Sequence, residues 1–163
     1  MAQEYSFDVV SQFDAQELLN AVDQTRREIS TRFDFKGVAA EIESGPRELT
    51  ILAESDYKLK AIVEVLTARM VKRGLSPKIL DLGEPQAAAR GNVRQVIKLR
   101  QGIGEDLARD LVKRIRGIAP RVQPRIQGDA LRVSSRDKDQ LQAVISGLRA
   151  LELPTPLQFI NYR

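Results

Sequence analysis

The sequence contains an internal repeat at an offset of 82 residues. Residues 48–68, ELTILAESDYKLKAIVEVLTA, align without a gap with residues 130–150, ALRVSSRDKDQLQAVISGLRA. Most matching positions are apolar, for example Leu49 with Leu131. Each copy predicts a strand, a turn and an amphipathic helix. Two strand–helix segments can resemble each other by chance, but an ungapped repeat of this length favours two copies of one structural unit.

Patterns on both sides of the repeat extend each copy to six elements, in the order strand, helix, strand, strand, helix, strand. Short apolar runs predict the strands, and apolar residues at helical spacing predict the helices. Asp14 and Asp137 each precede a helix and are followed three residues later by Glu17 and Gln140, the pattern of an N-terminal capping box. We expect strands at 5–10, 38–43, 47–53, 77–82, 94–99, 121–127, 130–134 and 157–162.

This order is that of a ferredoxin-like α+β fold, in which two helices cover one face of a four-stranded antiparallel sheet. We therefore predict two ferredoxin-like domains in tandem. The first domain spans residues 1–83, the linker residues 84–92 and the second domain residues 93–163. The linker is placed there because the stretch GEPQAAARGN has no periodic apolar residues and contains two Gly, one Pro and three Ala.

Charge is distributed unevenly along the chain. Residues 1–90 contain 12 Lys and Arg against 15 Asp and Glu, whereas residues 91–163 contain 14 against 7. The predicted first domain is therefore acidic and the second basic. A basic domain is typical of proteins that bind phosphates or an acidic partner, although charge also serves solubility.

The composition argues against an enzyme. The chain has no His and no Cys, so it lacks the commonest general base, the commonest metal ligand and the usual partner of a nucleophilic Ser or Cys. We expect no enzymatic activity, no metal and no cofactor; the weak catalytic candidates that remain are Asp34 and Lys36. There is no run of about 18 apolar residues and no basic segment followed by an apolar stretch near Met1. We therefore expect a cytoplasmic protein that does not bind membranes.

Alternation along the predicted strands identifies the side chains on the sheet face that the helices leave open. In the first domain this face carries acids together with Val10 and Leu52, and it should repel nucleic acid. In the second domain the open face carries cations, amides and a hydroxyl, which suit phosphate oxygens, ribose and base edges. The predicted binding residues of this face are Lys98, Arg100, Gln123, Arg125, Gln127 and Arg132.

Two other interpretations of these faces stay open. The acidic and basic faces could dock on each other, within one chain or across a dimer, or both could simply be solvated. RNA-binding sheets of this topology normally carry aromatic rings on their central strands, and RELTILA and ALRVSS have none. Phe33, Phe35, Phe159 and Tyr162 could stack on a base. Phe159 is more readily a core residue, and Phe33 or Phe35 could fix the first helix to its sheet.

Six motifs, in order along residues 6–163, resemble the bacterial YajQ family. They are SFDVVS, ISTRFDFKG, AESDYKLKA, KLRQGI, IQGDALRV followed by SRDKDQLQAVI, and LQFINYR. The resemblance implies two ferredoxin-like domains in a cytoplasmic protein that binds a nucleotide or RNA without enzymatic activity, with cyclic di-GMP proposed as a ligand for some members. The motif positions add candidate binding residues: Arg32, Phe33, Lys36, Lys98, Arg100, Gln101, Gln127, Phe159, Asn161 and Arg163.

From the residues and the resemblance we predict a non-catalytic nucleotide-binding protein with a regulatory role. Its ligand is RNA or a cyclic dinucleotide such as cyclic di-GMP. The alternative is a protein-interaction module that pairs with a transcription regulator, which the outward-facing Val10 and Leu52 suggest. A homo-oligomer is compatible with either function.

Overall fold

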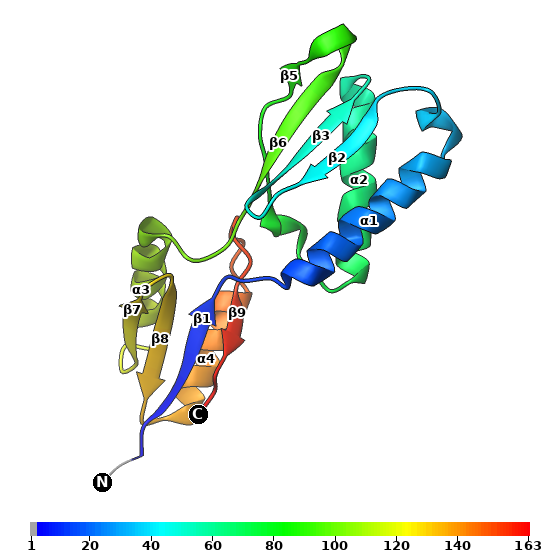
Figure 1. Ribbon diagram of the computed structural model, residues 1–163. Coiled ribbons are helices and arrows are strands. Elements are labelled where there is room, and N and C mark those ends of the chain that lie inside the picture. The colour runs from blue at the N-terminus through cyan, green and yellow to red at the C-terminus, as the bar shows by residue number, and fades with distance from the viewer. Residues whose placement is uncertain (1–2) are drawn as a thin grey trace. The chain divides into compact units, whose positions relative to one another are not determined.

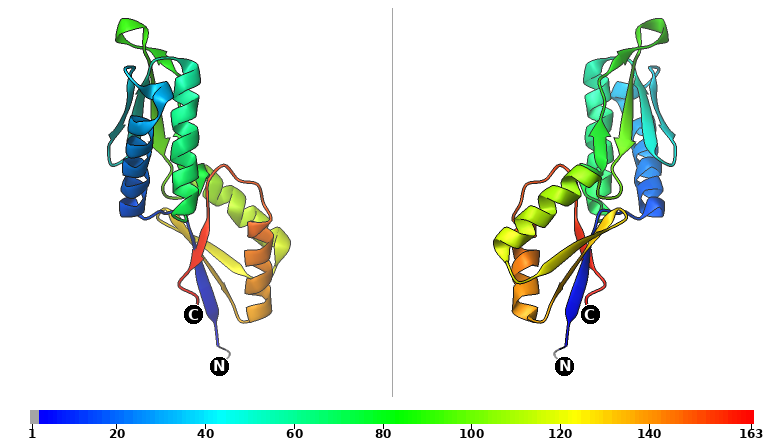
Figure 2. Two further views of the ribbon diagram at one scale, coloured as in Figure 1. Left: turned by 90° about the vertical axis from the view of Figure 1, so that its right-hand side faces the viewer. Right: turned by 90° about the vertical axis from the view of Figure 1, so that its left-hand side faces the viewer.

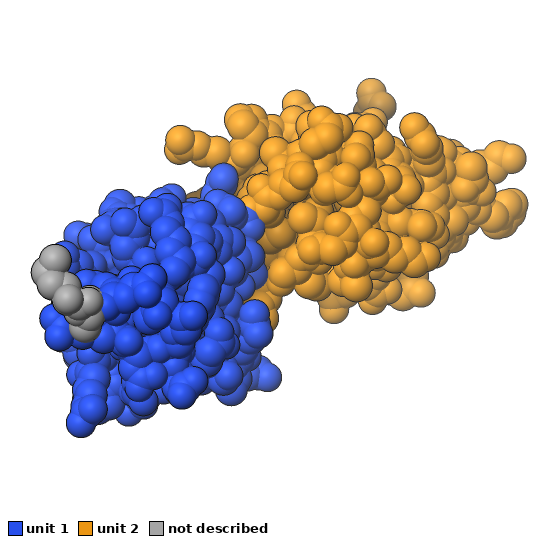
Figure 3. Space-filling view, turned by 90° about the horizontal axis from the view of Figure 1, so that it is seen from below, with its two compact units in different colours: residues 1–12, 101–163 blue, residues 13–100 orange. Residues whose placement is uncertain are grey.

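The computed structural model describes residues 3–163 and divides the chain into two compact units (Figure 1). Unit 1 consists of residues 1–12 and 101–163, and unit 2 of residues 13–100, as Figure 3 shows in two colours. Each unit has its own antiparallel sheet, its own two α-helices and its own hydrophobic core. The predicted α+β class with ferredoxin-like units is therefore confirmed.

Unit 2 is one continuous stretch of chain, and its sheet order is β2-β3-β6-β4, with β5 also paired to β6. Three short 3-10 turns connect its elements. Both helices lie on the same face of the sheet (Figure 2). In chain order its elements are α1 (Ala15–Thr31), β2 (Ala40–Ser44), β3 (Glu48–Ala53), α2 (Asp56–Lys72), β4 (Leu80–Leu82), β5 (Gln86–Ala87) and β6 (Val93–Leu99).

Unit 1 begins with β1, is interrupted by the whole of unit 2, and resumes with α3. Its sheet order is β7-β8-β1-β9, so that β1 is a central strand. Both helices again cover one face of the sheet (Figure 2). In chain order its elements are β1 (Tyr5–Val10), α3 (Glu105–Ile118), β7 (Gln123–Gln127), β8 (Ala130–Ser135), α4 (Lys138–Arg149) and β9 (Gln158–Ile160).

The units exchange one strand each relative to the predicted tandem arrangement. Contiguous domains at 1–83 and 93–163 would place β1 beside β3 and β6 beside β8. Instead β1 pairs with β8 and β9, and β6 pairs with β3 and β4. Residues 84–92, the expected linker, lie within unit 2, where they form β5 and a turn through Arg90 with φ 61°. The observed division of the chain thus differs from the expected one.

Core packing explains why β1 and β6 are not interchangeable. On β1, Phe7 is only 1% exposed and fills the core of unit 1. Its counterpart on β6 is Gln95, which is buried and donates from Nε2 to the Gly83 carbonyl at 2.7 Å. A buried amide requires such a partner, and the connection between β4 and β5 in unit 2 supplies it.

Charge complementarity favours the same assignment of strands. Asp8 of β1 lies directly opposite Arg132 of β8. Lys98 of β6 lies between Glu48 of β3 and Asp81 of β4. Opposite charges across neighbouring strands are stabilising, whereas the unexchanged arrangement would lose these pairs.

The two copies of the internal repeat form equivalent strand–helix segments, as predicted. Its two copies are β3 with α2 and β8 with α4, whose helices begin 82 residues apart at Asp56 and Lys138. The aligned apolar positions are buried in both copies, including Leu49 with Leu131 and Leu66 with Leu148. The same six-element order therefore arises twice, with one central strand of each sheet taken from the other half of the chain.

The predicted helix starts are confirmed, but neither capping box is complete. The Asp14 carboxylate accepts hydrogen bonds from the backbone N–H groups of Gln16 and Glu17. Asp137 accepts one from Asp139 in the same way. The carboxylate of Glu17 does not turn back to Asp14; it accepts a hydrogen bond from Arg73 at 3.0 Å and so ties α1 to α2.

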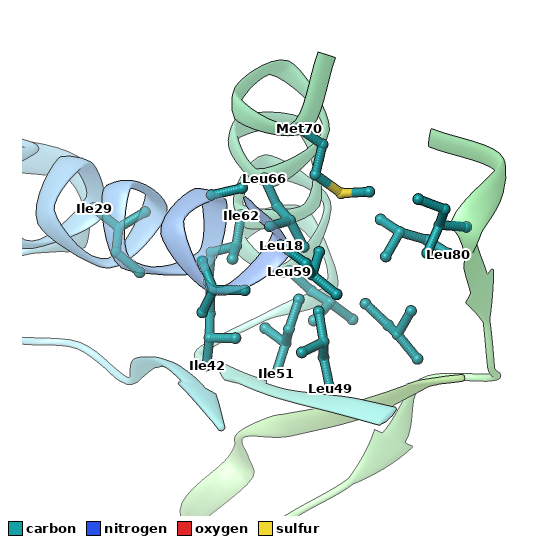
Figure 4. Close-up of a cluster of buried hydrophobic side chains, with 14 of the residues drawn as sticks. Leu18, Ile29, Ile42, Leu49, Ile51, Leu59, Ile62, Leu66, Met70 and Leu80 are labelled. Atoms are coloured by element: carbon teal, nitrogen blue, oxygen red, sulfur yellow. The ribbon is translucent and has the colours of Figure 1, made fainter. Parts of the chain in front are cut away.

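Each core lies between the helices and the sheet of its own unit. Figure 4 shows the core of unit 2, in which side chains from α1, α2, β2, β3 and β4 point toward one another. In unit 1 Ile126 lies on the core side of β7 by alternation but is 47% exposed, because it stands near the end of this edge strand, close to the turn. Burial of apolar side chains on one face leaves the other face of each sheet for polar residues.

Candidate functional site

The outer face of the unit 1 sheet, opposite its helices, carries several of the predicted binding residues. Gln123, Arg125 and Gln127 of β7 are exposed, and Arg132 and Ser134 of β8 are half-buried. The strand register places Arg125 directly opposite Arg132 and Gln123 opposite Ser134. These two strands therefore present adjacent guanidinium groups, flanked by amides and a hydroxyl.

Asp8 of β1 lies on this face and is held by two donors. Its Oδ1 accepts a hydrogen bond from Arg132 Nε at 3.0 Å, and its Oδ2 accepts one from Asn161 Nδ2 at 2.8 Å. The Asp8 side chain is 13% exposed, and the hydrogen bond from Arg132 is the main cause that lowers its pKa. The negative charge is thus neutralised within the sheet, while the Arg132 Nη groups are not engaged by Asp8. Asp8, which was predicted to lie on the acidic face, therefore lies on the basic face because of the strand exchange.

The end of the chain joins the same face. Asn161 has a positive φ of 55°, which interrupts the regular pairing of β9 after Ile160. Beyond it, Ser6 and Arg163 exchange backbone hydrogen bonds of 3.1 and 2.9 Å. The Arg163 charge also helps to lower the pKa of Asp8, so the predicted residues Asn161 and Arg163 both belong to this region.

A second pair of arginines lies just beyond the strand ends. Arg121 precedes β7 and Arg136 follows β8, and both are exposed. They line one pocket of about 400 Å³, together with Glu4, Gln123, Ser134, Ser135 and Asp137. Sequence reasoning missed this pair, although residues 121 and 136 continue the outward alternation of the hairpin.

The outer face of the unit 2 sheet is mostly acidic, and it contains one of the predicted cations, Lys98. Glu41, Glu43 and Glu48 are exposed on β2 and β3. Lys98 is placed between Glu48 and Asp81 by the strand register. The predicted basic set is therefore divided, because Lys98 belongs to the sheet that was expected to repel nucleic acid.

Arg100 and Gln101 stand where the chain passes from unit 2 to unit 1. Arg100 forms an ion pair with Asp81 at 3.4 Å and donates to the Lys78 carbonyl at 3.1 Å. Gln101 is exposed at the start of the second segment of unit 1. Arg100 thus contacts residues of unit 2, and it does not belong to the strand pair that carries Arg125.

The rings of Phe159 in β9 and of Tyr162 just after it do not form a stacking platform on the outer face of the unit 1 sheet. Phe159 packs against the core of unit 1, with its ring edge-on to Phe7 at 6.0 Å and beneath the Arg149 guanidinium. Tyr162 stacks on Phe7 at 6.4 Å. The expectation that Phe159 is a core residue agrees with this geometry, so its role in ligand binding is not supported.

The remaining predicted residues form a corner at the end of α1 in unit 2. Arg32 makes a two-pronged ion pair with Asp34, which raises the pKa of Arg32 and lowers that of Asp34. The Arg32 guanidinium also lies over the Phe35 ring, which is buried. Phe33 is 89% exposed and Lys36 is exposed. Phe35 therefore fixes the corner, and Phe33 is the ring that faces solvent.

A groove of about 510 Å³ runs from this corner along α2. Tyr57, another exposed ring, lies at its start, and Lys60, Arg69 and Lys72 follow at helical spacing. Its cations are balanced in part by acids, since Arg69 pairs with Glu28 at 3.3 Å. The groove could accept an aromatic ligand with a phosphate, but its mixed charge makes it a weaker anion site than the unit 1 face.

Two further properties bear on what the site can do. Residues 3–163 contain no cluster of three or more carboxylate, His or Cys side chains arranged to bind a metal ion. Within the same residues, no helix has both the length and the apolarity that a membrane crossing requires.

Comparison with known proteins gives a consistent result over the whole chain. A family profile described as YajQ-like nucleotide-binding protein matches residues 5–163. A nucleotide-binding protein of Picosynechococcus sp. is 50% identical over 163 residues, which is 100% of both chains. Nucleotide-binding proteins of Synechococcus elongatus and Chloroflexus aurantiacus are each 52% identical, again over 100% of both chains.

Proposed function

This chain belongs to the family of YajQ-like nucleotide-binding proteins, and from that premise we propose that it binds RNA or a cyclic dinucleotide such as cyclic di-GMP without catalysing a reaction. The proposed binding surface is the outer face of the unit 1 sheet. Binding without turnover suits a regulatory protein, and such ligands are met in the cytoplasm, where we expect this protein to act.

The observation that supports this proposal best is the juxtaposition of Arg125 and Arg132. They are directly opposite each other on neighbouring strands, where like charges repel unless an anion lies between them. The acid on this face, Asp8, is already held by Arg132 and Asn161. Guanidinium groups bind phosphate oxygens through parallel N–H donors, so the pair favours a phosphodiester.

The neighbouring polar groups suit the rest of a nucleotide. Gln123 and Gln127 are exposed on either side of Arg125. Amides can hydrogen-bond ribose hydroxyls and base edges, while arginines position the backbone. Because no aromatic ring of β1, β7 or β8 lies on this face, we expect phosphate contacts to supply most of the affinity.

Fluorescence titration with labelled oligouridylate and labelled cyclic di-GMP tests the surface. Arg125→Gln removes one exposed cation, and we expect about fivefold weaker binding at about 0.1 M salt, with a shallower dependence of affinity on salt. Arg116→Gln, an equal charge change on α3 in the other layer of unit 1, should bind like the original protein. Equal affinities for all three proteins would exclude the outer face of the unit 1 sheet.

A protein partner is the alternative function, and the acidic outer face of the unit 2 sheet favours it. Val10 lies on the unit 1 sheet and Leu52 on the unit 2 sheet, so the apolar patch expected from the sequence is divided between them. Glu41, Glu43 and Glu48 would attract a basic surface. Capture of a purified basic partner that survives nuclease treatment and is lost in Glu41→Lys with Glu43→Lys would support this function.

A further inference from the structure

The β7–β8 hairpin carries one pair of arginines on its outer face, and a second pair lies just beyond its strand ends. Arg125 and Arg132 face each other within the strands. Four positions further from the turn, just beyond the ends of both strands, Arg121 and Arg136 line one pocket. Gln123 and Ser134 lie opposite each other between the two pairs. The hairpin therefore presents a ladder of cation pair, polar pair and cation pair.

Three of these arginines have no competing ion pair. Among residues 3–163, no carboxylate comes within salt-bridge distance of Arg121, Arg125 or Arg136. Arg132 is paired with Asp8 through Nε. Four guanidinium groups thus line one face, and three of them are free of an intramolecular anion.

The acids near the ladder are few and partly occupied. Asp137 lines the pocket but accepts the N–H of Asp139 as the cap of α4. Glu4 also lines the pocket and is exposed. The ladder as a whole therefore stays cationic.

The spacing of the two pairs distinguishes between phosphate ligands. Residues 121 and 125 are four positions apart, with β7 beginning between them at Gln123, so they are separated by at most about 13 Å of chain. A cyclic dinucleotide holds its two phosphates in one small ring and therefore matches one arginine pair better than two pairs in succession. A single strand carries phosphates at regular intervals and can follow the hairpin over this length.

We propose that the β7–β8 hairpin is a track for single-stranded RNA, with Arg125 and Arg132 as one phosphate subsite and Arg121 and Arg136 as the next. This inference rests on the proposed nucleotide-binding function and assigns its ligand class. Gln123 and Ser134, between the pairs, are placed to contact ribose hydroxyls. Arginine planes also stack on bases, so a track without aromatic rings binds with little base preference.

A length series of oligouridylates tests the track by fluorescence anisotropy, with labelled cyclic di-GMP measured in parallel. We expect affinity to rise from the dinucleotide to the tetranucleotide and octanucleotide. Arg121→Gln should weaken octanucleotide binding about fivefold at about 0.1 M salt and reduce the salt slope by about 0.7. The same change should leave the binding of the linear dinucleotide and of cyclic di-GMP unchanged. Arg125→Gln should weaken the binding of the octanucleotide and of cyclic di-GMP.

Arg121→Lys and Arg116→Gln are the controls. Arg121→Lys keeps the charge and should restore the salt slope, whereas Arg116→Gln should match the original protein for every ligand. If Arg125→Gln weakens cyclic di-GMP but Arg121→Gln has no effect on the octanucleotide, the track is excluded and the proposed function survives. If the original protein binds none of these nucleotides, both the track and the proposed function are excluded.

Discussion

Across the outer face of the unit 1 sheet, one row of residues runs Arg125, Arg132 and Asp8, whereas the equivalent row in unit 2 runs Glu43, Thr50 and Val96. Glu43 and Arg125 are separated by the same 82 residues as the two copies of the repeat. Equivalent positions of one fold thus carry opposite charges. The fold determines where a side chain lies, and the local sequence determines what that surface can bind.

The difference in charge belongs to the faces and not to the units. Unit 1 contains 11 Lys and Arg against 9 Asp and Glu, and unit 2 contains 15 against 13. Both units therefore have a net charge of +2, although the two halves of the sequence differ strongly in net charge. Strand exchange places Asp8 on the basic outer face of unit 1 and Lys98 on the acidic outer face of unit 2.

The largest expected effect tests which sheet contains β1. Phe7→Ala should lower the free energy of unfolding by about 3–5 kcal/mol, because it opens a cavity in the core of unit 1. Hydrogen exchange should show lost protection in β8. The matched change Leu49→Ala should instead expose β3 in unit 2. Loss of protection in β3 upon Phe7→Ala would contradict the observed strand pairing.

The next effect tests the acid within the basic face. Asp8→Asn should cost about 1–2 kcal/mol, since a charged hydrogen bond from Arg132 is weakened. The pKa of Asp8 is lowered below 3.8 by folding, so its contribution is present above that pH and is lost as pH falls through the lower folded value. Denaturant unfolding between pH 7 and about pH 2 should show the two proteins converging in acid. A constant difference at every pH would contradict a role for the Asp8 charge.

A smaller effect compares the caps of the two equivalent helices. Ser55 accepts the N–H of Lys58, and Asp137 accepts that of Asp139. Ser55→Ala and Asp137→Ala should each cost about 1 kcal/mol in thermal unfolding experiments. A much larger cost at either position would show that the side chain has a second role.

The smallest effect sharpens the contrast between the two outer faces. Glu43→Arg gives unit 2 the residue type of unit 1 at the equivalent position and should change stability by less than about 0.5 kcal/mol. Oligouridylate affinity should stay near that of the original protein, because the surrounding acids, Glu41 and Glu48, remain. A clear gain in affinity would show that one exposed arginine suffices and that the ladder of unit 1 is not required.

Local sequence patterns predicted the elements well, because they depend on neighbouring residues. The repeat, the helix caps at Asp14 and Asp137, and the buried faces of β3 and β8 all follow from periodicity and short spacings. The last strand is shorter than expected because Asn161 adopts a positive φ. That conformation depends on the contact between Asn161 and Asp8, which local periodicity does not report.

The pairing of strands across the chain was harder to predict. Both β1 and β6 alternate apolar and polar residues, so either could occupy the central place in either sheet. Their distinction lies in single contacts: Phe7 in one core, and Gln95 with the Gly83 carbonyl in the other. The predicted site was therefore partly wrong in composition. Lys98 and Arg100 were grouped with Arg125 on the assumption that neighbours in sequence share a sheet.

Because of the strand exchange, the two units respond differently when the chain is cut into contiguous fragments. A fragment of residues 13–100 keeps every strand of its sheet, whereas residues 101–163 alone lack β1. Without that strand β8 and β9 would each lose a hydrogen-bonded neighbour, and the arginines of the hairpin would lose the carboxylate of Asp8. Truncation near the start of this chain therefore removes a strand from the proposed ligand-binding sheet, most of which lies near the end of the chain.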